Sequence, residues 1–490
     1  MSVDQILAAL REKNIALSVV DGKLRIQGGK DALADPGLLE LVRGHKEALI
    51  AAIANGEVAR MVDGPVDVPP NRIPAGCAHI TPDMLPLVAL GESEIAAIVA
   101  TVPGGAANVK DIYPLGPLQE GIFFHYLMQR EGDVYLLPTL TRFDSRAHLD
   151  RYVVALQAVI DRHDILRSSF AWEGLPEPVQ VVWRRAPLVV EEIALDPVDG
   201  DFAAQLQHRY APERFRLDVR EAPLVRLFAA REPASDRWVV LELLHHLLSD
   251  HTSGTILRDE IETLLLGRGD ELAPAPPFRD FIAQSRLGVS RQEHESFFSR
   301  MLRGVDEPTA PFGLLDVRGN GARLLEAHQD VDAALGQRLR ACARMLGVSV
   351  ACICHLAWAM VLARVTGRDD VVFGTLLFGR MRAGADADRV VGMFINTLPI
   401  RIAVGDEGAR ASLRSTHELL SQLLRHEHAP LALAQRCSAV QAPNPLFTTH
   451  LNYRYEGAQV KSAEAAERTA RAWAGIEHVR SEERRVGKEC

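Results

Sequence analysis

The chain has 490 residues, of which 47% are apolar and 24% charged, and 55 Lys and Arg against 64 Asp and Glu give a formal charge of −9. This is the composition of a globular protein with ample material for a core, and the length suggests about three folding units. The acidic balance argues against nucleic-acid binding, which usually shows a basic domain or stripe.

The cysteines and the apolar stretches indicate the cellular compartment of the protein. The six cysteines show no disulfide-framework spacing, and the N-terminus lacks the features of a secretory signal, so we expect a cytoplasmic protein. The longest apolar stretch, 348–365, contains His355 and Arg364 and is borderline for a membrane span, so a buried helix is the better interpretation. Cys352, Cys354 and His355 fit no common zinc spacing and are interpreted as core residues.

The first unit covers residues 1–56, and its pattern predicts a helix, a β-hairpin and a second helix. Apolar residues recur at helical spacing over 3–13, and Pro36 opens the second helix. Between them, Asp21-Gly22 is the kind of pair that favours a two-residue hairpin turn, because both positions tolerate positive φ. So small a unit buries a limited core and often leans on a partner or dimerises, so a homodimer through this unit is one expectation.

The predicted hairpin leaves an open strand edge that can accept an added strand. Lys23 and Arg25 lie beside that edge. From spacing alone, they either keep a solvated strand soluble or receive an acidic peptide.

The rest of the chain divides into four segments. Residues 57–108, rich in Pro and Gly, are predicted to be a semi-rigid linker with one short helix over 93–102. Residues 109–285 and 286–475 alternate helical and β-rich stretches, an α/β (α+β) pattern that predicts two lobes. Residues 476–490 are highly charged without apolar periodicity, so we expect a disordered tail that looks more like adapter read-through than a natural domain end.

Local patterns within the two lobes predict individual elements. Helices are expected over 149–166, 255–267 and 336–347, and strands over 238–246, 370–379 and 393–402.

The densest group of chemically capable side chains is HHLLSDH, residues 245–251, at the turn between a predicted strand and a predicted helix. A histidine here can take or give a proton near neutral pH, and Asp250 can orient the imidazole or pair with an arginine. A structural role and a metal site stay open as alternatives. However, His245 and His246 point to opposite faces of a strand, so a metal would leave one of them out of its shell.

This segment resembles the HHxxxDG signature of condensation domains of nonribosomal peptide synthetases, in the superfamily of acyltransferases similar to chloramphenicol acetyltransferase. Seven regions resemble the family's motifs in the same order over about residues 109–470: 113–125, 162–170, 245–251, 274–283, 367–380 together with 391–401, 426–432 and 451–455. Two positions depart from the pattern. His251 replaces a Gly that we expect to need positive φ, a region in which His is one of the few other residues found, and Leu431-Ala432 replace the Phe-Glu of the sixth motif.

The N-terminal unit is similar to the docking domains that begin some synthetase polypeptides. This resemblance implies that Lys23 and Arg25 contact the acidic C-terminal tail of an upstream synthetase.

The family resemblance also implies a fold and a reaction. We expect two chloramphenicol-acetyltransferase-like lobes in a V shape, with a tunnel between them. A donor and an acceptor carrier protein would each deliver a thioester-bound substrate on a phosphopantetheine arm, and an amide bond would form between the substrates. We expect no cofactor or metal bound by this chain, and neither nucleic acid nor membrane as a partner.

Roles follow residue by residue from the same resemblance. His246 is the expected catalytic residue, and His245 is expected to be structural. Asp250 should form a buried ion pair with Arg162 or Arg167. Gly392, Met393, Phe394 and Asn396 resemble the loop that floors the tunnel, where they either contact substrate or belong to the core. We also expect the second lobe to be truncated, because the family continues well beyond Tyr455.

Other functions within reach of this sequence are epimerisation, transfer of an acyl group to an alcohol, and non-catalytic recruitment of other enzymes. The docking unit argues against epimerisation, since epimerisation domains normally follow a carrier domain. The presence of His246 argues against a recruitment domain, because such domains usually lose it.

Overall fold

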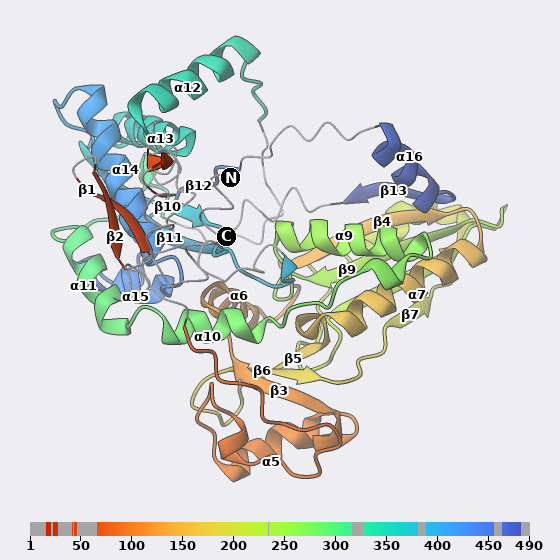
Figure 1. The fold of residues 1–490 in the computed structure, drawn as a ribbon. Coiled ribbons are helices and arrows are strands. Elements are labelled where there is room, and N and C mark those ends of the chain that lie inside the picture. Colours follow the sequence, from red (N-terminus) through yellow and green to blue (C-terminus); the bar gives the residue numbers. More distant parts are fainter. Residues whose placement is uncertain are drawn as a thin grey trace.

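The structure of the protein is a computed structural model. It describes residues 16–20, 23–27, 42, 44–46, 66–233, 235–315, 325, 327–380, 389–454 and 463–481. Figure 1 shows two lobes of mixed α/β structure side by side, joined around helices α6 (Pro117–Met128) and α10 (Arg279–Leu287). The two-lobed α/β expectation is confirmed. Short 3-10 turns lie at Pro82–Met84, Gly105–Asn108, Asp164–Arg167, Pro197–Asp199, Gly269–Glu271 and Pro311–Gly313.

The N-terminal hairpin is present as predicted from Asp21-Gly22. Strands β1 (Ala16–Val20) and β2 (Lys23–Gln27) pair antiparallel, and Val20 faces Lys23 across the turn. Lys23 and Arg25 therefore lie on β2, while their side chains fall outside the described part. The two helices expected around the hairpin also lie outside it, apart from Val42 and 44–46.

The described part of the expected linker, 66–108, is a packed layer and not an extended connection. Helix α5 (Glu92–Thr101) forms where a short helix was predicted. Its buried Ile95 and Ile98 join a core with Ile112 and Val181 of the neighbouring strands. Pro and Gly here mark turns between apolar residues, and those residues bury their side chains against the first lobe.

The first lobe contains two sheets. The larger has the strand order β13-β4-β9-β8-β7, and the smaller the order β3-β6-β5. Helices α7 and α9 cover one face of the larger sheet and helix α8 packs on the other, so each face has its own core. The bounds are β3 (Val109–Pro114), β4 (Leu136–Phe143), β5 (Ser168–Ala171), β6 (Val179–Trp183), β7 (Val189–Glu192), β8 (Val225–Arg231), β9 (Trp238–His245), β13 (Ile476–Ser481), α7 (Arg146–Arg162), α8 (Phe202–Arg209) and α9 (His251–Leu265).

The second lobe is built on a three-stranded sheet of order β11-β10-β12, in which β10 pairs antiparallel with β11 and parallel with β12. The apolar stretch around 350–366 is a helix, α13, which buries Cys352 and His355 in the core of this lobe, as predicted. The bounds are β10 (Asp370–Leu377), β11 (Asn396–Ala403), β12 (His450–Leu451), α11 (Arg291–Met301), α12 (Ala333–Leu346), α13 (Val350–Thr366), α14 (Ala409–Arg425) and α15 (Leu431–Arg436).

After the second lobe the chain returns to the first. Helix α16 (Ala463–Ala472) contacts α9, and β13 pairs antiparallel with β4 at the edge of the five-stranded sheet. This corrects the disorder expected from Ile476 onward, as far as Ser481. An edge strand is held by main-chain hydrogen bonds along one side, so its outward side chains can be charged without any apolar periodicity. Residues 482–490 lie outside the described part.

Among the described helices, no single one is long and apolar enough to cross a membrane. Taken together, helices α12 and α13 reach the length and apolar composition of a membrane span, but the two helices are bent by 105° relative to each other.

Candidate active site

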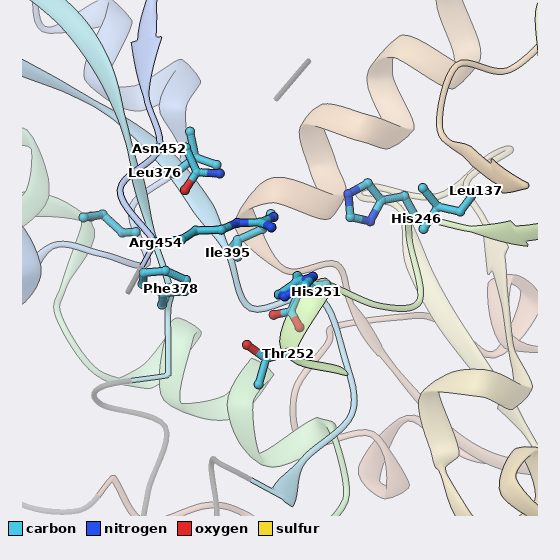
Figure 2. Close-up of a pocket in the computed structure, with 11 residues that line it drawn as sticks. Leu137, His246, His251, Thr252, Leu376, Phe378, Ile395, Asn452 and Arg454 are labelled. Atoms are coloured by element: carbon cyan, nitrogen blue, oxygen red, sulfur yellow. The ribbon is translucent and has the colours of Figure 1, made fainter. Parts of the chain in front are cut away.

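A pocket opens between the two lobes at the end of β9 (Figure 2). The first lobe contributes Leu137 of β4 and residues of the strand–turn–helix segment, and the second contributes Ile395, the end of β10 and the segment that follows β12. The lining residues are Leu137, His246, Asp250, His251, Thr252, Leu376, Leu377, Phe378, Ile395, Asn452 and Arg454.

One hydrogen bond fixes the main chain of His246 and another orients its ring. The main-chain N–H of His246 donates to the carbonyl of Tyr135 at 2.9 Å, and the ring Nδ1 lies 2.6 Å from the carbonyl oxygen of Ser249. A carbonyl oxygen can only accept, so Nδ1 carries the proton and Nε2 has the lone pair of the neutral ring. The imidazole is therefore poised to accept a proton through Nε2 while keeping its hydrogen bond to Ser249.

His245 lies on the opposite side of the strand and is fully buried. Its Nδ1 accepts from the N–H of Leu247 at 3.0 Å, which leaves the ring proton on Nε2, 2.8 Å from an oxygen of buried Asp133. This pair sits inside the first lobe, away from the pocket. The geometry supports the structural role expected for His245.

Asp250 begins helix α9 and also ties the two lobes together. Oδ1 accepts from the N–H of Ser253 at 2.8 Å, as a helix cap does, and from Arg380 Nη2 at 3.0 Å. Oδ2 accepts from the N–H of Phe394 at 3.2 Å. Asp250 and Arg380 are both buried, so the predicted buried ion pair exists.

The partner predicted for Asp250 was wrong. Arg162 pairs with Glu260 at 3.0 Å, and Arg167 pairs with Asp164 at 2.8 Å and donates to main-chain carbonyls within the first lobe. Both arginines thus hold parts of the first lobe together. Arg380 was missed because it comes from the second lobe; the one available signal was its position at the end of the motif-like stretch 367–380.

The expected floor loop is hydrogen-bonded to Asp250 through Gly392 and Phe394. Ser253 Oγ donates to the carbonyl of Gly392 at 2.8 Å and lies 2.9 Å from Arg380 Nη2, so the loop and the motif share one buried hydrogen-bond group. A Cβ at position 392 would lie 2.1 Å from a ring carbon of Phe278, which explains why a glycine is needed there.

The other floor residues are buried and do not line the pocket. Met393 and Phe394 belong to the core of the first lobe, and the side-chain amide of Asn396 donates to the carbonyls of Glu427 and Ala429 at 2.8 Å. Ile395 is the loop residue that reaches the pocket. Of the two alternatives for this loop, the geometry favours core packing at Met393, Phe394 and Asn396.

His251 occupies a position that does not require glycine. It is the first residue of α9, and Phe312 is the one described non-glycine residue with positive φ. The expectation that this turn needs positive φ was therefore wrong. A helical first residue accepts any ordinary side chain, so His251 is accommodated and its ring can border the pocket.

Two further residues, His125 on α6 and Glu260 on α9, have pKa values shifted from their usual range. Burial lowers the pKa of His125, whose Nδ1 lies 2.6 Å from the hydroxyl of Tyr135. Burial alone would raise the pKa of Glu260 on α9, but hydrogen bonds from His163 and Arg162 lower it to about 2. The helix that presents Asp250 and His251 is thus anchored to α7 by an ionised carboxylate.

In the part of the chain that the structure describes, no group of three or more His, Cys, Asp or Glu side chains is arranged to hold a metal ion.

Comparison with known proteins places this geometry in context. A family model described as "Condensation domain" matches residues 109–485. Malpinin synthetase from Mortierella alpina is 50% identical over 399 residues, which are 81% of this chain and 5% of that protein. Malpibaldin synthetase from the same organism is 46% identical over 418 residues, which are 85% of this chain and 7% of that protein. The chain thus spans a small fraction of these relatives.

Solved structures show the same fold at low identity. The EpoB NRPS cyclization-docking bidomain from Sorangium cellulosum aligns with a TM-score of 0.55 at 18% identity, covering 92% of this chain and 84% of that one. The condensation domain from Monacolin K polyketide synthase MokA aligns with a TM-score of 0.52 at 20% identity, covering 70% of this chain and 81% of that one.

Proposed function

This chain belongs to the condensation domain family of nonribosomal peptide synthetases, and we propose that it joins two carrier-bound substrates through an amide bond. The donor is an acyl or peptidyl thioester, and the acceptor is the α-amine of an aminoacyl thioester. The observation that carries the proposal is the orientation of His246, whose lone-pair nitrogen Nε2 belongs to a ring that lines a pocket shared by both lobes.

The proposed steps balance as follows. The acceptor amine attacks the donor carbonyl carbon, so a C–N bond forms and the carbonyl electrons move to oxygen. The amine proton passes to Nε2 of His246. The intermediate then collapses, the C–S bond breaks, and the leaving thiolate takes up the proton from His246. A single general base of this kind contributes about 10²- to 10⁴-fold in rate, and positioning of two substrates supplies much of the remainder.

Condensation domains act on substrates held by carrier domains and need no cofactor of their own. For this chain we propose that both phosphopantetheine arms come from partners, one carrier supplying the donor and another the acceptor. Such thiol-dependent partners operate in a reducing compartment, which favours the cytoplasm.

The test follows the acceptor carrier by intact mass after mixing the chain with a loaded donor and a loaded acceptor carrier. Wild type should add the mass of one donor unit to the acceptor, and His246→Ala should slow this by about 10²- to 10⁴-fold. Epimerisation would instead change the configuration of one substrate with no mass transfer, and an O-acyltransferase would require an alcohol acceptor. Absence of transfer by folded wild-type protein would contradict the proposal.

For the N-terminal hairpin we propose docking of an acidic C-terminal peptide from an upstream synthetase. The support is the paired β1–β2 edge that carries Lys23 and Arg25, together with the fold-level likeness of 92% of this chain to a bidomain that includes a docking domain. An acidic synthetic peptide should bind wild type, and K23E/R25E should bind it at least tenfold more weakly, about 1.4 kcal/mol. Equal binding would refute the charge role, and light scattering would report whether the unit also dimerises.

A further inference from the structure

The second lobe presents two polar side chains to the pocket from one short segment. Strand β12 pairs in parallel with β10, with Gly374 opposite His450 and Thr375 opposite Leu451. Both segments then continue to the pocket: the end of β10 supplies Leu376 and Leu377, Phe378 follows directly, and the segment after β12 supplies Asn452 and Arg454. Asn452 and Arg454, two positions apart just after β12, both line the pocket.

Arg454 and Arg380, the two arginines of the site, differ in their hydrogen bonds and ion pairs. Arg380 is buried and bonded to Asp250, Ser253 and the carbonyl of Val390. Arg454 is exposed and makes no hydrogen bond or ion pair to another residue within the described part of the chain. In Figure 2 the Arg454 side chain extends across the pocket toward the side on which His246 lies.

The proposed reaction creates a negative charge that this cation is placed to meet. When the amine attacks, the donor carbonyl oxygen becomes an oxyanion, while the base must lie on the side of the attacking nitrogen. Apart from Arg454, the pocket residues around this space include the apolar side chains of Leu137, Leu376, Leu377, Phe378 and Ile395. An apolar surrounding strengthens a hydrogen bond from a cation to a developing oxyanion.

We propose that Arg454 is a catalytic residue that donates hydrogen bonds to the oxyanion of the tetrahedral intermediate, opposite the base His246. This inference rests on the proposed amide-forming function. Arg454 stays a guanidinium throughout and transfers no proton; the proton path runs from the amine through His246 to the leaving thiolate. Because the interaction strengthens as charge develops, its loss should lower the rate at saturating substrate more than it weakens binding.

The experiment compares wild type, Arg454→Gln and Arg454→Lys in single turnovers with saturating loaded carriers. The control is Arg364→Gln, which removes an exposed arginine on α13 that does not line the pocket. Thermal unfolding checks that each variant is folded. Arg454→Gln should lower the rate constant by about 10²- to 10³-fold, Arg454→Lys should lose less because it keeps the charge, and Arg364→Gln should match wild type.

A second arm separates the oxyanion from the phosphate of the pantetheine arm. It uses a donor acyl thioester of N-acetylcysteamine, which has no phosphate. If Arg454 serves the oxyanion, Arg454→Gln is impaired equally with this donor and with the carrier-bound donor. A defect confined to the carrier-bound donor would assign Arg454 to the phosphate and overturn the inference, as would a loss of less than about threefold with both donors.

The outcomes also distinguish this inference from the function on which it rests. Active wild type with an equally active Arg454→Gln variant removes the oxyanion role and leaves the amide-forming function standing. Folded wild type that forms no amide removes both.

Discussion

Asp250 and Arg380 are separated by 130 positions in sequence and lie 3.0 Å apart, buried between the two lobes. Asp250 also caps α9 and accepts from the N–H of Phe394 in the floor loop. One carboxylate therefore sets the start of the helix beside His246, the position of the loop and the contact between lobes.

Removing either member of this pair should be strongly destabilising. Asp250→Ala leaves a buried guanidinium, and Arg380→Ala leaves a buried carboxylate, each at a cost of about 3–5 kcal/mol in unfolding free energy. The double variant should cost less than the sum, with a coupling of about 0.5–3 kcal/mol, because no buried charge is then left alone. Urea unfolding of all four proteins measures this.

The matched control for this double-mutant cycle is the more exposed pair Asp370–Arg401 in the second lobe, with side chains 39% and 27% exposed. Its coupling should be about 1 kcal/mol or less. Additive effects at Asp250 and Arg380 would show that the two residues do not stabilise the fold as a pair.

The two adjacent histidines should respond differently to replacement. His245→Ala leaves one oxygen of the buried Asp133 carboxylate without its donor and should cost at least about 1–3 kcal/mol of stability. His246→Ala removes one hydrogen bond to Ser249, about 1 kcal/mol, while amide formation falls far more. Thermal unfolding and single-turnover assays separate these effects, with the exposed His79→Ala as a control. A stable but inactive His245→Ala protein would instead assign chemistry to His245.

Gly392 should be intolerant of even one added methyl group. The new Cβ would lie 2.1 Å from Phe278, and the clash should cost about 1–3 kcal/mol because the ring is buried and cannot move away freely. Gly405→Ala is the control: its added Cβ meets no atom within 4 Å, so its effect should stay within about 0.5 kcal/mol. If Gly392→Ala and Gly405→Ala unfold at the same urea concentration, the close packing of the loop is refuted.

The Glu260 anchor predicts a particular acid sensitivity. Burial opposes ionisation, but His163 and Arg162 lower the pKa of Glu260 from 4.5 to about 2 in the folded protein. A folded-state pKa below the unfolded value means that this stabilisation is present above pH 4.5 and is lost as the pH falls toward 2. The stabilisation from this ionised carboxylate is at most about 3 kcal/mol.

Glu260→Gln should therefore be less stable than wild type at pH 7, and the difference should shrink as the pH is lowered below 4.5. Urea midpoints at several pH values test this. Glu271→Gln, which alters an exposed pair with Arg268, should track wild type across the same range. A gap between Glu260→Gln and wild type that is independent of pH would show that packing, and not ionisation, accounts for the effect.

Local features of the sequence determined much of this protein. The Asp21-Gly22 pair predicted the hairpin, alternation and helical periodicity predicted the strand, turn and helix around residues 238–267, and the apolar stretch predicted the buried helix α13. These signals suffice because turn preference and hydrophobic periodicity act between residues a few positions apart. The family motifs added the candidate base His246 and the buried charge of Asp250.

Only the tertiary structure decided which distant residues meet. Arg380 was chosen over Arg162 and Arg167 by the approach of the second lobe to α9, and Arg454 reaches the pocket because β12 pairs with β10. The charged segment after Ile476 became a strand because β4 offered an unpaired edge. Ion pairs and strand pairing depend on distances set by the whole fold, and no local pattern in the sequence records those distances.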